Sequence, residues 1–109
     1  MVNKGSGKEI TLFQSKVYAL ARKVPAGRVT TYSAIAKKLD SSPRAVGNAL
    51  RVNPFAPIVP CHRVIKSDRT IGGFKGKTKG KAICEKIKLL RKEGVIFVDG
   101  KIEKKQIIF

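Results

Sequence analysis

The chain has 109 residues, 42% of them hydrophobic, which suits one domain with a small core and is too short for two ordinary domains. It carries 24 Lys and Arg residues against 7 Asp and Glu residues, which gives a formal net charge of +17. This excess of positive charge favours a polyanionic partner, and nucleic acid is the first such partner to consider. No apolar run reaches the length of a membrane span, and the N-terminal residues lack the apolar stretch of a signal peptide. The composition therefore predicts a cytoplasmic protein without membrane contact, but it names no activity.

The first half of the chain predicts three helices. Thr11, Thr31 and Ser42 each stand directly before a stretch in which apolar residues recur at helical spacing, and Ser and Thr hydroxyls cap helix N-termini. A short polar turn separates the last two helices, which predicts a helix-turn-helix, with a generic helical hairpin as the alternative. The predicted helices run from Thr11 to about Lys23, from Thr31 to Leu39 and from Pro43 to Arg51.

The second half predicts short strands around one more helix. Val64–Ile65 is a candidate strand, and Asp99–Gly100 favours a type I′ turn that joins Val95–Val98 to Lys101–Ile102 as a hairpin. Between these elements, apolar spacing predicts a helix from about Thr78 to Lys92.

These elements predict an α+β, helix-rich fold: a winged-helix-like domain with a helix-turn-helix and a small β component. Residues 1–10 are polar and glycine-rich and are expected to be flexible. Residues 11–109 are expected to form the single domain. Within it, Tyr18 should cover the core with its ring while its hydroxyl reaches water, and Cys84 should pack against the core.

Cys61 and His62 are the residues that could do chemistry. A cysteine acts as a nucleophile in its thiolate form, and a neighbouring proton acceptor favours that form. His62, the only histidine in the chain, is such a neighbour of Cys61. Adjacent side chains on a strand point to opposite faces, so a direct Cys–His bond needs a turn or a bridging water. The alternative is a buried structural cysteine. One histidine and two cysteines fit neither the usual zinc spacings nor a disulfide framework, so no metal or cofactor is expected.

Residues 59–64, Val-Pro-Cys-His-Arg-Val, resemble the active-site signature of the O6-alkylguanine-DNA alkyltransferases. The resemblance covers residues 10–98 in order, which corresponds to the C-terminal catalytic domain alone, so the additional N-terminal domain of most relatives is expected to be absent. The other matching segments are Gly27–Tyr32, Arg44–Arg51, Asn53–Pro54, Gly72–Phe74 and Leu89–Gly94.

The resemblance implies DNA repair by a monomer that moves the alkyl group of O6-alkylguanine in double-stranded DNA to Cys61, once per molecule. His62 would draw the thiol proton through a water, and Glu93 would orient His62. Tyr32 would donate to the leaving guanine, and Asn53 would bond the backbone of the Pro60–Cys61 turn.

The resemblance also implies a DNA-binding surface and a base pocket. Arg44 would fill the stack that the flipped nucleotide vacates, and small residues on the same helix would allow close approach to the minor groove. The backbone carbonyls of Cys61 and Val64 would bind the exocyclic amine of guanine. Phe74 and Lys75 stand where several relatives carry Tyr and Ser, so substrate preference is expected to shift. The implied DNA-binding residues are Thr31, Arg44, Ala45, Gly47, Asn48 and Arg51, and the implied pocket residues are Val64, Gly73, Phe74 and Lys75.

Two other functions were weighed. Gly72–Thr78 is one residue short of a phosphate-binding loop, so nucleotide hydrolysis is rejected. A non-enzymatic winged-helix protein that binds DNA or lesions would explain the charge and the helix-turn-helix, with Cys61 structural. An alkyltransferase-like subfamily of this kind carries tryptophan where Cys61 stands, so the cysteine favours repair.

Overall fold

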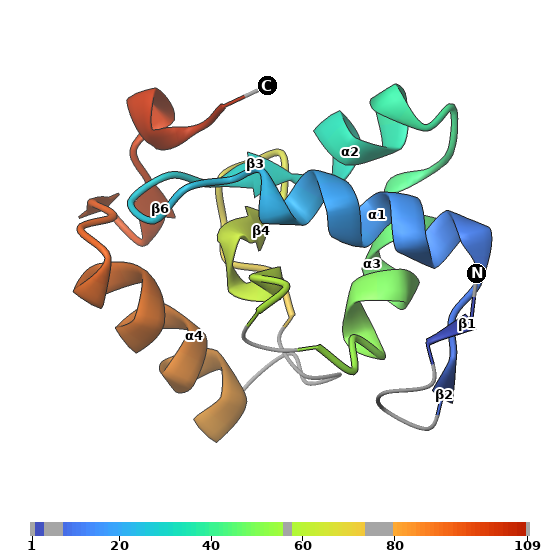
Figure 1. Cartoon of the computed structure of the whole chain (residues 1–109). Coiled ribbons are helices and arrows are strands. Elements are labelled where there is room, and N and C mark those ends of the chain that lie inside the picture. The colour runs from blue at the N-terminus through green and yellow to red at the C-terminus, as the bar shows by residue number, and fades with distance from the viewer. Residues whose placement is uncertain (1, 4–7, 56–57, 74–79, 109) are drawn as a thin grey trace.

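Two short parallel strands, β3 (Thr30–Thr31) and β4 (Val64–Ile65), lie in the middle of the molecule between two groups of helices (Figure 1). Because successive side chains of a strand point to opposite faces, Val64 packs into one apolar cluster and Ile65 into another. The computed structural model describes residues 2–3, 8–55, 58–73 and 80–108. Both halves of the described chain therefore meet at β4.

The first half consists of α1 (Leu12–Arg22), α2 (Tyr32–Lys38) and α3 (Pro43–Arg51). Thr11, Thr31 and Ser42 cap these helices, and each side-chain oxygen accepts a backbone N–H of the first turn. The predicted helices and their starts are confirmed. The helix-turn-helix is formed by α2 and α3, which pack against each other and against α1.

The apolar cluster of this half joins the three helices to the segment before β4. Its members come from α1 (Val17, Tyr18, Ala21), α2 (Ile35, Ala36), α3 (Val46, Ala49, Leu50) and the later residues Val59 and Val64. Tyr18 is 4% exposed, and its hydroxyl donates to the carbonyl oxygen of Ala49 at 2.7 Å. The expectation that this hydroxyl reaches water was wrong, because the close approach of α1 and α3 puts a helix carbonyl in its path.

The second half consists of α4 (Lys81–Lys92) and the hairpin of β5 (Phe97–Val98) and β6 (Lys101–Ile102). Leu90 of α4 packs with Val29, Ile65, Val95 and Ile102 in the second apolar cluster. The hairpin turn is the predicted one, with positive φ at both Asp99 and Gly100.

The start of α4 differs from the prediction. Gly80 precedes the helix with φ 85° and ψ −151°, a conformation outside the helical region, so the helix cannot extend back through it to Thr78. Residues 78 and 79 themselves lie outside the described residues. Cys84 is exposed on α4, so the expectation that it packs against the core was also wrong.

The two ends of the chain add short elements. Near the N-terminus, β1 (Val2–Asn3) pairs antiparallel with β2 (Lys8–Glu9); this pairing was not expected, and the flexibility of residues 1–10 stays a prediction. Near the C-terminus, η2 (Lys104–Gln106) is followed by a segment that pairs with the chain entering β3 through hydrogen bonds between Val29 and both Gln106 and Ile108.

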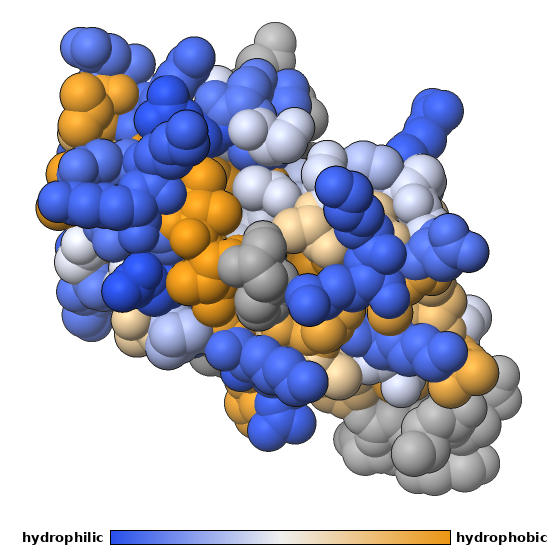
Figure 2. Space-filling model, turned by 90° about the horizontal axis from the view of Figure 1, so that it is seen from above, coloured by the Kyte–Doolittle hydropathy of each residue, from blue (hydrophilic) through white to orange (hydrophobic). Residues whose placement is uncertain are grey.

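These elements confirm the α+β, helix-rich class with a helix-turn-helix. Figure 2 shows the molecule from above the view of Figure 1. Hydrophilic side chains cover most of this face, with apolar residues between them. None of the helices in the described part of the chain is long and apolar enough to cross a membrane.

Candidate active site and DNA-binding surface

A tight turn presents Cys61. The N–H of Cys61 donates to the carbonyl oxygen of Val59 at 2.9 Å, and Pro60 between them has φ −81° and ψ 72°, the geometry of an inverse γ-turn. A single turn of 3₁₀ helix, η1 (Cys61–Arg63), follows directly. The side chain of Cys61 is half-buried and that of His62 is 5% exposed. The turn that the adjacent Cys–His pair requires is therefore present.

Asn53 holds this turn from the end of α3. Its side-chain Nδ2 donates to the carbonyl oxygen of Val59 at 3.0 Å, and its Oδ1 accepts the N–H of Phe55 at 2.9 Å. The expected bond to the turn is present, one residue before the predicted Pro60–Cys61 pair. Because Val59 also accepts the N–H of Cys61, Asn53 fixes the carbonyl to which the Cys61 backbone is bonded.

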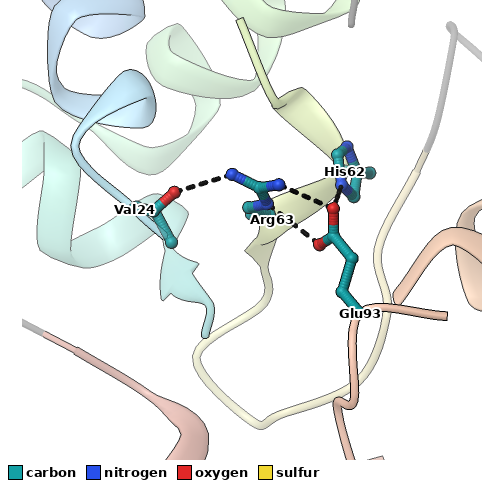
Figure 3. A network of polar contacts seen from close by, with 4 residues as sticks. All are labelled: Val24, His62, Arg63 and Glu93. Atoms are coloured by element: carbon teal, nitrogen blue, oxygen red, sulfur yellow. Dashed lines mark hydrogen bonds and ion pairs between the residues drawn. The ribbon is translucent and has the colours of Figure 1, made fainter. Parts of the chain in front are cut away.

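Glu93 binds both His62 and Arg63, the two residues that follow Cys61 (Figure 3). His62 Nε2 lies 3.1 Å from Glu93 Oε2, while Arg63 donates from Nε to Oε1 at 2.9 Å and from NH2 to Oε2 at 2.6 Å. Arg63 NH1 also donates to the carbonyl oxygen of Val24 at 2.9 Å. Glu93 is the C-cap residue of α4, so this network joins α4, η1 and the end of α1.

The electrostatics of this network fix the state of His62. Burial raises the pKa of Glu93, but the hydrogen bonds from Arg63 and His62 outweigh it and hold that pKa below its ordinary value. An ionised carboxylate only accepts hydrogen bonds, so His62 Nε2 carries a proton. Burial also lowers the pKa of His62 below 6.5, against the opposing effect of Glu93. At neutral pH His62 is therefore uncharged, and its Nδ1 is the nitrogen with a free lone pair.

Tyr32, the first residue of α2, lies beside the same turn. Burial, followed by the nearby charge of Cys61, raises the pKa of Tyr32 to about 12, so its hydroxyl keeps its proton. Gly72 has φ +75°, and a Cβ added there would lie 3.1 Å from Cε2 of Tyr32 and 3.3 Å from its hydroxyl oxygen. Only glycine allows the loop after β4 to pass this close to the Tyr32 ring.

Two of the four predicted pocket residues lie within the described chain. Val64 is buried in β4 and Gly73 is half-buried in the following loop. Their carbonyl oxygens both accept hydrogen bonds from Nζ of Lys86, at 2.9 Å each. Phe74 and Lys75 lie outside the described residues.

The predicted DNA-binding residues of α3 form one exposed row. Arg44, Asn48 and Arg51 are exposed at intervals of four and three residues, which places them on one helix face. The opposite face of α3 packs into the core. Ala45 and Gly47 are half-exposed beside the row. Thr31 is not part of this surface: it is 8% exposed and caps α2, and its DNA contact stays a prediction.

Sequence reasoning did not single out Arg63 or Lys86. Arg63 follows the Cys–His pair directly, and its place in the Pro-Cys-His-Arg motif was the available signal. Lys86 stands at helical spacing from Leu90 and Ile83 on the apolar face of α4, and a charged residue in such a stripe was the signal there.

Comparison with known proteins gives the family. The family model of the 6-O-methylguanine DNA methyltransferase, DNA binding domain, matches residues 12–95. The methylated-DNA–protein-cysteine methyltransferase of Thermococcus sibiricus is 49% identical over 86 residues, which cover 78% of this chain and 46% of that protein. This chain thus spans about half the length of such curated relatives.

Two solved structures share the fold. The O6-methylguanine-DNA methyltransferase of Pyrococcus kodakaraensis matches with a TM-score of 0.68 and 45% identity, over 79% of this chain and 48% of that chain. Atl1 of S. pombe, in complex with damaged DNA containing O6-carboxymethylguanine, matches with a TM-score of 0.74 and 28% identity, over 89% of this chain and 94% of that chain. The chain accordingly belongs to the family of the 6-O-methylguanine DNA methyltransferase DNA-binding domain.

Proposed function

We propose that this protein repairs O6-alkylguanine in double-stranded DNA by moving the alkyl group irreversibly to Cys61. One observation carries the proposal: a half-buried Cys61 begins the turn in which the next residue, His62, is bonded to an ionised Glu93. A structural cysteine needs no such neighbour. A relative 49% identical over 86 residues is named methylated-DNA–protein-cysteine methyltransferase, in agreement with this chemistry.

The chemistry is a displacement at carbon. His62 takes the thiol proton of Cys61 on Nδ1, through a water, because Nε2 is bonded to Glu93. The Cys61 thiolate then attacks the alkyl carbon, so that the sulfur–carbon bond forms as the bond between that carbon and guanine O6 breaks. Glu93 stabilises the imidazolium that His62 becomes. The product is a thioether, which explains a single turnover.

The leaving guanine becomes negatively charged as its bond to the alkyl carbon breaks, and Tyr32 would donate a hydrogen bond to it. Its pKa of about 12 keeps the phenol protonated throughout the reaction. The phenol therefore donates a hydrogen bond without losing its proton, and the departing guanine anion takes a proton from water. The His62 imidazolium returns the former thiol proton to water, so the atoms balance: one thiol hydrogen is exchanged for one alkyl group.

The exposed row on α3 is the proposed contact to the duplex. The target oxygen lies inside the base stack, so the nucleotide must be extruded before Cys61 can reach it. Arg44 stands in the first turn of α3, exposed and without a partner among the described residues, and it would fill the vacated space. We expect the protein to act as a monomer in the cytoplasm.

A second function, lesion binding without transfer, is supported by the match to Atl1. That structure contains damaged DNA, and this chain covers 94% of it. The two functions share the fold and the α3 surface, and they differ in whether Cys61 reacts.

The deciding experiment is the intact mass of the protein after incubation with a duplex carrying one O6-methylguanine. Repair predicts the gain of one methyl group in place of one hydrogen, mapped to the Cys61 peptide. The chain supplies its own matched control, because Cys84 is the more exposed thiol: Cys84→Ser should retain the transfer and Cys61→Ser should lose it. An unchanged mass with the duplex still bound would leave lesion binding as the function.

A further inference from the structure

Lys86 is a buried charge that the proposed chemistry does not use. Its side chain is 0% exposed although it stands in the middle of α4. Burying a cation without partners is strongly unfavourable, so a fully buried lysine requires partners that offset the loss of hydration.

Those partners are three backbone carbonyls. Nζ of Lys86 donates to Val64 at 2.9 Å, to Ile71 at 2.7 Å and to Gly73 at 2.9 Å. An ammonium group has three N–H donors, so each is used once. Val64 belongs to β4, whereas Ile71 and Gly73 belong to the loop that follows it. The lysine therefore ties that loop to the strand.

In the described part of this loop, Ile71 packs against the second apolar cluster, whereas the two glycines that follow have no side chain to anchor them. Gly72 and Gly73 lack side chains, and Gly72 must keep a φ of +75° next to the Tyr32 ring. Lys86 Nζ itself lies 5.9 Å from the centroid of that ring. The same ammonium group thus sits among the strand, the glycine loop and Tyr32.

We propose that Lys86 is the positioning residue of the nucleobase pocket, and that its ammonium group holds the Ile71–Gly73 loop against β4. This inference deepens the proposed function and rests on it, since Val64 and Gly73 are pocket residues only if the chain binds an alkylated guanine. Lys86 would not touch the base. It would set the separation between the Val64 and Gly73 backbones, to whose carbonyl oxygens it is bonded.

The groups around Lys86 act in opposite directions on its ammonium form. Burial lowers the pKa of Lys86 to about 7, and the nearby Cys61 acts in the opposite direction. The three carbonyl acceptors also favour the ammonium form, because each is hydrogen-bonded to it. Tyr32 remains a neutral phenol, and the charge of Lys86 is one cause of the lowered pKa of His62.

The test compares pocket-dependent with pocket-independent reactions of Cys61, in a Cys84→Ser background. Lys86→Met keeps an unbranched side chain and removes all three donors, and Lys86→Gln keeps amide donors without charge. Lys88→Met, an exposed position on the same helix, is the matched control. The probes are the free base O6-benzylguanine, which must enter the pocket, and iodoacetamide, whose limiting rate at high pH reports access to the thiolate. Binding to an undamaged duplex and cooperative unfolding report the fold.

We expect Lys86→Met to slow the reaction with O6-benzylguanine about 100-fold, the scale of a misplacement near 1 Å. Its limiting rate with iodoacetamide and its duplex binding should match those of the control, and Lys86→Gln should recover part of the loss. An unchanged rate with the base would overturn the proposal. Equal losses of rate with both reagents would also overturn it, because Lys86 would then support Cys61 itself. Loss of duplex binding and of cooperative unfolding in both Lys86 variants would overturn it too, because Lys86 would then support the whole fold. A Cys84→Ser parent that does not react with the base would instead refute the proposed function.

Discussion

In the described part of the chain, the two halves of the molecule differ in whether any charged side chain enters the interior. The half made of α1, α2 and α3 buries apolar residues and keeps its basic side chains on the surface, among them Arg44 and Arg51. The half made of α4 and the β5–β6 hairpin turns charge inward, with Lys86 fully buried and Glu93 bonded to η1. The difference agrees with the proposed function, in which α3 would supply the surface for DNA and α4 would support the reacting groups. Variants in the two halves should therefore have separable effects.

Glu93→Gln should give the largest effect on the chemistry. It removes the negative charge that fixes the His62 proton on Nε2 and stabilises its charged form, and a displaced general base costs about 10²–10⁴ in rate. The single-turnover rate of methyl transfer should fall by that factor, while affinity for an undamaged duplex stays the same. The rate is measured by quenching the reaction with an O6-methylguanine duplex and determining protein mass.

Glu85→Gln is the matched control, since Glu85 is an exposed acid on the same helix. It should react at the rate of the parent protein. If Glu93→Gln lowered duplex affinity as much as it lowered the rate, the division between the two halves would not hold.

Arg44→Ala should produce the converse effect. Extruding a nucleotide costs a few kcal/mol. If Arg44 offsets about 1.4–2.7 kcal/mol of that cost, its loss would slow repair of a duplex about 10- to 100-fold. Reaction with free O6-benzylguanine should be unchanged, because no base is flipped. The rates with both substrates are compared with those of Arg22→Ala, an exposed arginine on α1. Equal slowing with free base and duplex would show that Arg44 has no part in flipping.

The sequence predicted the first half better than the second, and the reason lies in the range of the contacts. Thr11, Thr31 and Ser42 cap helices through bonds to residues three positions away, so a local pattern sufficed. The predicted start of α4 at about Thr78 was wrong. The residue before the observed helix is Gly80, which has no side chain to cap it, so the sequence carries no capping signal at that position.

Residues of the candidate site could be predicted only where they belong to a recognisable sequence motif. The chemistry of a thiol beside the one histidine singled out Cys61 and His62, and the resemblance added Glu93. The structure brings His62 and Glu93 into contact across 31 positions. Lys86 was missed because its partners are backbone carbonyls 13 to 22 residues away, and carbonyls leave no trace in a sequence. The Tyr18 hydroxyl was misjudged for the same reason, since it binds the carbonyl of Ala49.

Acid should weaken both the reaction and the fold through the network on α4. The pKa of His62 is lowered below 6.5 and that of Glu93 is lowered below 4.5. As pH falls from 6.5 toward the folded pKa of His62, the unfolded chain binds a proton first, so the free energy of unfolding decreases. The contribution of Glu93 is present above 4.5 and is lost as pH falls through its folded pKa.

Urea unfolding between about pH 5 and 8 measures this loss. His62→Asn should flatten the upper part of the profile, and methyl transfer by the parent protein should fall only below pH 6.5, where His62 gains its proton. A rate that already falls between pH 7 and 8 as acid is added would contradict a neutral His62 as the proton acceptor.

Gly47→Ala should have the smallest effect, and its sign is the informative part. Gly47 lies inside α3, and a Cβ added there would meet nothing within 4 Å, so the fold itself does not need glycine. A glycine inside a helix is destabilising by about 0.5–1 kcal/mol relative to alanine, and the variant should be more stable by that amount. If the α3 backbone approaches DNA closely, the added methyl group should nevertheless weaken duplex binding. Ser15→Ala, inside α1, should also favour its helix without changing affinity. Greater stability with unchanged affinity in both variants would place the DNA against the long side chains of α3, Arg44, Asn48 and Arg51, rather than against its backbone.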